Sequence, residues 1–86
     1  MKFTADTHFS AMAEVEDFCR YVNIERGIFF HPEDKFSAET AHISEEEASV
    51  WNRLIIECNA VCTANGTDLY DIIIPLTLCA GTARMN

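Results

Sequence analysis

The chain has 86 residues, 49% of them hydrophobic, and carries a formal net charge of −8 from 14 Asp and Glu against 6 Lys and Arg. This length suits a single domain, residues 1–86, and the hydrophobic content excludes the usual composition of a disordered chain. The acidic balance argues against direct binding to nucleic acid or to an anionic membrane surface, because both are bound through clustered Lys and Arg. A basic protein partner is expected instead.

We expect no targeting signal in this chain. Residues 1–10 include a lysine and an aspartate before any apolar run, unlike a secretory signal peptide. The most apolar stretch, residues 72–79, contains Pro75 and is far shorter than the roughly 20 residues that span a bilayer. Four cysteines in such a chain are more typical of reduced thiols than of a disulfide framework. The sequence therefore predicts a cytoplasmic protein.

The first predicted element is a helix near residues 10–25. Either Thr7 or Ser10 is suited to cap its start, and Gly27 is suited to end it in a left-handed conformation. Apolar residues repeat every three or four positions, which places them on one helix face. These residues are Met12, Val15, Phe18, Cys19 and Val22.

Residues 28–43 hold several aromatic residues without a sustained helical or strand period. We interpret this segment as an irregular aromatic loop. An alternative is a short hairpin at residues 28–38, with a turn at residues 32–34.

The clearest helix begins after Ser44, which forms a capping box with Glu47. The acidic run Glu45-Glu46-Glu47 places negative charge at the positive end of the helix dipole. An apolar stripe follows for about four turns, until Asn65-Gly66 offers a left-handed cap. The stripe consists of Ala48, Trp51, Leu54, Ile55, Cys58, Val61 and Cys62.

The last segment, residues 67–84, has both helical spacing and strand-favouring isoleucines. We predict a helix that Thr67 caps and that Pro75 kinks or ends, with a strand at residues 70–78 as the alternative. This helix is apolar on more than one side, so a homo-oligomer through residues 69–80 is possible. The predicted fold is mostly α, a small three-helix domain with an irregular aromatic loop. The alternative is an α+β fold with the hairpin and the C-terminal strand.

Two cysteines one helical turn apart, Cys58 and Cys62, have the spacing to bind zinc together with His8, His31 or His42. Both lie in the apolar stripe, so we interpret them as core thiols and predict no metal site. The chain has no phosphate-binding glycine loop, metalloprotease helix motif or nucleophile elbow. We therefore expect a protein that is not an enzyme and that needs no cofactor.

These features favour a small acidic noncatalytic protein-binding module, an inhibitor or accessory regulator that acts on a basic partner. Nucleic-acid charge mimicry is one way in which it would do so. Aromatic anchors beside charged residues are typical of interfaces. The predicted partner-binding residues are Phe29, Phe30, His31, Phe36, Glu45, Glu46 and Glu47.

Two other interpretations of those residues remain open. The three phenylalanines are equally suited to cover the end of a small helical core, and the acidic run is explained by the helix start alone. Alternative functions are a small-molecule or metal-binding domain and a self-assembling structural protein.

Overall fold

The computed structural model describes residues 3–30 and 35–76, and it confirms a mostly α fold. The helices are α1 (Met12–Arg20), the π-helix η1 (Tyr21–Glu25), α2 (Ala38–Ala41) and α3 (Glu45–Ala64), and residues 69–76 are also helical. No strand occurs in these two ranges, so the alternative α+β fold is not observed there. Residues 31–34 of the alternative hairpin and residues 77–78 of the alternative strand lie outside the described part.

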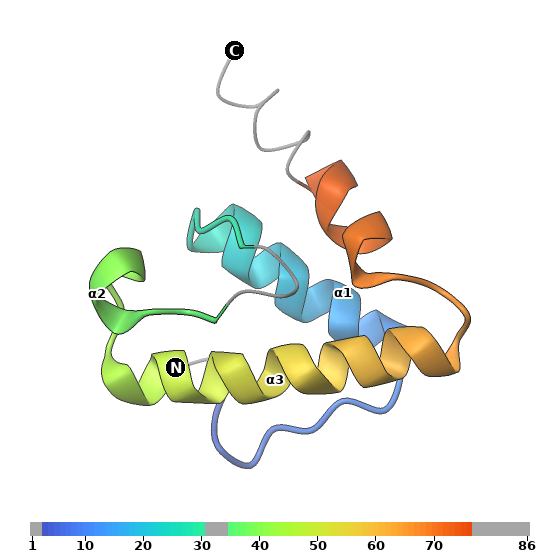
Figure 1. The fold of residues 1–86 in the computed structure, drawn as a ribbon, viewed down its shortest axis with the longest axis horizontal. Helices are drawn as coiled ribbons and strands as arrows, with labels where there is room; N and C mark the ends of the chain where they lie inside the picture. The colour runs from blue at the N-terminus through green and yellow to red at the C-terminus, as the bar shows by residue number, and fades with distance from the viewer. Residues whose placement is uncertain (1–2, 31–34, 77–86) are drawn as a thin grey trace.

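The longest helix, α3, organises the fold (Figure 1). The helices α1 and η1 cross one side of α3, and the N-terminal segment runs along another side. The short helix α2 lies near the beginning of α3, and residues 69–76 follow its far end. None of the described helices combines the length and the apolar character needed to cross a bilayer.

The C-terminal end of α3 forms as the sequence predicts, and at its start the Ser44 half of the predicted capping box is present, whereas the carboxylate of Glu47 binds Arg26 instead. The hydroxyl of Ser44 accepts a hydrogen bond of 3.0 Å from the backbone N–H of Glu47. At the other end Gly66 has a φ of 68°, and the N–H of Thr67 donates to the carbonyl of Cys62 over 2.9 Å. This bond and the left-handed glycine form a Schellman cap, which satisfies carbonyl groups that the helix end leaves without partners.

The start of α1 differs from the prediction, because neither Thr7 nor Ser10 is its cap residue. Ala11 occupies that position, and the carboxylate of Glu14 accepts hydrogen bonds from the backbone N–H groups of Ser10 and Ala11, at 2.9 and 3.1 Å. The bonds from Ser10 favour the charged form and lower the pKa of Glu14. Glu14 thus supplies the carboxylate half of a capping box, and the cap residue itself, Ala11, makes no side-chain hydrogen bond to the first turn.

The first helix ends in the π-helix η1, which the sequence did not predict. Within η1 the side chain of Asn23 is buried, and its Nδ2 donates a hydrogen bond of 2.8 Å to the carbonyl of Cys19. In an α-helix that carbonyl would accept from the backbone N–H of Asn23, so the side-chain bond favours the wider π turn. Gly27, with a φ of 66°, then ends the helical segment as predicted.

The last predicted helix is confirmed as far as residue 76. Its cap is Asp68 and not Thr67, because Oδ1 of Asp68 accepts a hydrogen bond of 3.0 Å from the N–H of Tyr70. Leu69 and Ile73 pack into the core, whereas Ile74 is exposed. Residues 77–80 lie outside the described part, so self-association through residues 69–80 remains a prediction.

Aromatic rings fill much of the core around Trp51. Its indole lies edge-on to Phe18, Tyr21 and Phe36, with ring centroids 6.4, 6.3 and 5.0 Å apart. Such edge-to-face pairs add stabilisation to that of apolar burial. Trp51 therefore connects α1, η1 and the segment before α2 to α3.

A polar clamp on α3 fixes the N-terminal segment. The guanidinium of Arg53 donates to the backbone carbonyls of Thr4, Ala5 and Thr7, over 2.8 to 3.2 Å, and also pairs with Glu57. Glu57 in turn accepts a 2.9 Å hydrogen bond from the N–H of Phe9. These bonds hold the segment beside α3, and they neutralise Arg53 within the fold.

Candidate functional site

The predicted acidic run divides into exposed and buried members at the start of α3. Glu45 and Glu46 are exposed, whereas Glu47 is only 6% exposed. Because Ser44 fixes the first helical turn, the two exposed carboxylates project from an ordered backbone. The exposed acidic side chains at this helix start are thus Glu45 and Glu46.

The carboxylate of Glu47 binds the guanidinium of Arg26 through two hydrogen bonds, of 2.7 and 3.1 Å. The hydrogen bonds to Glu47 are the main cause of the raised pKa of Arg26. The guanidinium also lies over the ring of Trp51, 5.2 Å from its centroid, where a cation–π contact adds to the attraction. This ion pair ties the end of η1 to the start of α3.

The three phenylalanines of the predicted binding surface have different environments. Phe36 is buried against Trp51, and Phe30 is half-buried, with its ring centroid 5.1 Å from that of Phe36. Phe29 is 41% exposed. Phe30 and Phe36 therefore cover the core, as the alternative interpretation held, and Phe29 is the most exposed of the three. His31 lies outside the described residues.

The segment that carries Phe36 is fixed to α3 by Asn52. The side-chain amide of Asn52 accepts a 2.6 Å hydrogen bond from the backbone N–H of Phe36 and donates one of 3.1 Å to its carbonyl. This two-sided contact resembles the pairing of one strand residue with its neighbour, although no sheet is present in the described ranges. It holds residues 35–37 alongside the middle of α3.

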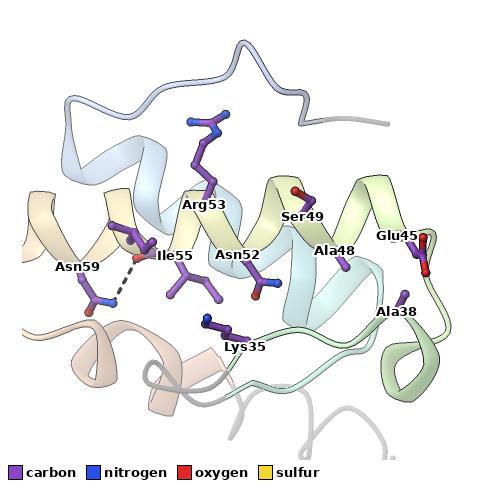
Figure 2. Close-up of a pocket in the computed structure, with 10 residues that line it drawn as sticks. Lys35, Ala38, Glu45, Ala48, Ser49, Asn52, Arg53, Ile55 and Asn59 are labelled. Atoms are coloured by element: carbon purple, nitrogen blue, oxygen red, sulfur yellow. Dashed lines mark hydrogen bonds between the residues drawn. The ribbon is translucent and has the colours of Figure 1, made fainter.

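An open groove of about 580 Å³ lies between that segment and α3 (Figure 2). Figure 2 shows Glu45 at one end, Asn59 at the other and Lys35 opposite the middle of the helix. Apolar side chains in the groove include those of Ile55 and Ile56. The groove thus combines apolar surface with charges of both signs.

Three cysteines, Cys19, Cys58 and Cys62, are buried as predicted for core thiols, and Cys79 lies outside the described residues. A hydrogen bond with Cys19 and burial raise the pKa of Cys58, and burial raises that of Cys62. Both thiols are therefore held in their neutral, unreactive form. In residues 3–30 and 35–76 no three His, Cys, Asp or Glu side chains lie close enough together to hold a metal ion.

The raised pKa of Cys58 makes the folded state less stable in alkali. The unfolded chain releases this proton near the ordinary pKa of 9.0, whereas the folded chain retains it. The folded state then binds more protons, so the free energy of unfolding falls by about 1.4 kcal/mol per pH unit for this thiol above about pH 9. Denaturant unfolding at several alkaline pH values measures the slope. Cys58→Ala should have a shallower slope, and equal slopes in the two proteins would contradict this expectation.

Several of these contacts join residues too far apart in sequence for any local pattern to reveal them. Arg26 and Glu47 are 21 positions apart, and Asn52 contacts Phe36 across 16 positions. The sequence signals were partial: Glu47 follows Ser44 as a capping-box residue, and Asn52 lies beside the apolar stripe. Neither pattern indicates that Glu47 contacts Arg26 or that Asn52 contacts Phe36.

Comparison with models of protein families, with curated protein sequences and with solved structures finds no match to this chain.

Proposed function

We propose that this chain is a small noncatalytic protein-binding module that acts as an inhibitor or accessory regulator of a basic protein. Its binding surface is the acidic corner, which we define as Glu39, Glu45 and Glu46. These three exposed residues lie on α2 and at the start of α3. Phe29, at 41% exposed, is a candidate aromatic anchor for the partner.

The observation that carries the proposal is the imbalance of exposed charge. Arg26 pairs with Glu47, and Arg53 pairs with Glu57. Two of the few basic side chains are therefore already bound to carboxylates within the fold. The exposed basic residues of the described part are Arg20, Arg26 and Lys35. Its exposed acidic residues are Asp6, Glu16, Asp17, Glu25, Glu39, Glu45, Glu46, Asp68 and Asp71. A surface of this kind attracts cationic partners and accelerates their association.

The rigid support of the acidic corner favours it over exposed acids that lie outside the helices, such as Asp6. The Ser44 cap and the Arg26–Glu47 pair fix the backbone of the first turn of α3. Charges held on an ordered element lose less conformational freedom on binding than charges on a loose segment. The corner is thus better suited to a specific partner than scattered acids are.

An affinity pulldown tests this proposal. Tagged protein is incubated with a lysate of the cells that produce it, at low and at moderate salt, and bound proteins are identified. We expect one stoichiometric basic partner whose recovery falls steeply with salt, because the interaction is between exposed charges. Glu45→Gln/Glu46→Gln should reduce its recovery by about five-fold or more.

The matched control is Asp6→Asn/Glu16→Gln, which removes the same charge from exposed positions elsewhere. It should leave recovery within about two-fold of the unmodified protein, since steering by net charge alone is weaker than a defined contact. Equal losses in both double variants, or recovery that does not depend on salt, would contradict the proposal. If duplex DNA releases the partner, the partner uses a nucleic-acid-binding surface, which would support charge mimicry.

A further inference from the structure

The most exposed large apolar side chain of the described part is Ile56, at 71%. It lies on the groove beside α3, next to Ile55, which is 4% exposed and forms part of the core. The groove is therefore a place where an incoming apolar side chain would contact both an exposed isoleucine and the edge of the core. Its volume of about 580 Å³ accommodates several side chains.

The charges of the groove are arranged along its length. Glu45 lies at one end, where the acidic corner adds Glu39 and Glu46. Lys35 lies opposite the middle of α3 (Figure 2). Arg53 also borders the groove, but its guanidinium is engaged by Glu57 and by three backbone carbonyls. Among the described residues of the groove, an occupant would meet negative charge at one end and one available cation, Lys35, further along.

We propose that the groove binds an amphipathic basic segment of the partner. An apolar side chain of the segment lies on Ile56, a neighbouring Lys or Arg pairs with Glu45, and an oxygen of the segment accepts a hydrogen bond from Lys35. This arrangement matches the charge order of the groove, and it follows the general pattern of an amphipathic helix in a groove. The inference rests on the proposed function, because it names the kind of segment that the acidic corner recognises.

The polar lining of the groove is compatible with an occupant. The side chain of Asn52, which lines the groove, is hydrogen-bonded to both the N–H and the carbonyl of Phe36. Its position in the groove is therefore fixed before a partner binds. Ser49 is exposed on the same side of α3 and offers a further donor and acceptor. Because the Asn52 side chain is already ordered, binding costs less conformational entropy.

The test uses a defined probe, a fluorescein-labelled 14-residue peptide of Lys and Leu with leucines at helical spacing. A second peptide has the same lysines and replaces every Leu by Ser. Fluorescence anisotropy titrations at fixed salt give the dissociation constant for each. We expect the Leu-containing peptide to bind about ten-fold more tightly, because only it places apolar side chains in the groove.

Two variants locate the contact. Ile56→Ser removes the exposed isoleucine from the groove, and Ile74→Ser makes the same change at a 53% exposed site on residues 69–76. Ile56→Ser should weaken binding of the Leu-containing peptide by about five-fold or more, and Ile74→Ser by less than two-fold. Circular dichroism spectra confirm that each variant remains folded.

The outcomes separate this inference from the proposed function. If Ile56→Ser and Ile74→Ser have equal effects, or if the two peptides bind equally, the groove is not the docking site. In that case a selective loss of binding in Glu45→Gln/Glu46→Gln would still support the acidic corner. Failure of both peptides to bind would overturn the inference, and the pulldown would decide the proposed function by itself.

Discussion

Trp51→Ala is expected to lower the free energy of unfolding by about 3–5 kcal/mol. The indole is 1% exposed and makes ring contacts with Phe18, Tyr21 and Phe36, so its removal opens a cavity between several elements. Domains of this size have a total stability of about 5–15 kcal/mol. The variant should therefore be partly unfolded or close to unfolding at 37 °C. Urea unfolding followed by circular dichroism measures the loss.

The matched control for Trp51→Ala is Ile56→Ala on the same helix. Ile56 is 71% exposed, so its replacement removes few packed contacts and should change stability by less than about 0.5 kcal/mol. A loss of under about 1 kcal/mol for Trp51→Ala would contradict the position of the indole at the centre of the core.

The second large effect is expected at the Arg26–Glu47 pair. Arg26→Met keeps an apolar side chain over Trp51 but leaves the buried carboxylate of Glu47 without its two hydrogen-bond donors. A buried charge that loses its partner is strongly destabilising. The side chain of Arg26 is 31% exposed, so water replaces part of the lost interaction. We expect a loss of about 2–3 kcal/mol, measured by urea unfolding.

A double-mutant cycle distinguishes a specific pair from two independent effects. Glu47→Met removes the carboxylate, and the double variant Arg26→Met/Glu47→Met leaves no buried charge at this position. The double variant should be more stable than Arg26→Met alone, by about 1 kcal/mol or more. Strictly additive losses would show that the two side chains do not interact in solution.

Local sequence patterns predict the longer helices of this fold well, because caps and apolar spacing act over only a few residues. They missed the short helix α2, which lies in the segment that we expected to be an irregular loop. Ser44 and Gly66 mark the ends of α3, and Gly27 marks the end of the first helical segment. The π-helix could not be predicted in the same way. It depends on Asn23 being buried with its side chain on the carbonyl of Cys19, and burial is decided by packing across the whole fold.

The candidate site was predicted only in part for the same reason. Local pattern placed Glu45 and Glu46 at an exposed helix start, where the structure has them. Local pattern could not show that Arg26 binds Glu47 or that Phe36 packs in the core, because both contacts depend on how segments distant in sequence come together. The groove beside Ile56 has no signal in the sequence at all. It exists because Asn52 holds residues 35–37 against α3.

The central claim is that binding depends on where the negative charge lies and not on how much there is. The most direct test is one anisotropy titration with the Lys and Leu peptide, comparing Glu45→Gln/Glu46→Gln with Asp6→Asn/Glu16→Gln. Both variants change the net charge of −8 by the same amount. We predict that the first weakens binding by about five-fold or more and the second by less than two-fold. Equal weakening in both would show that the acidic corner is not a specific binding surface.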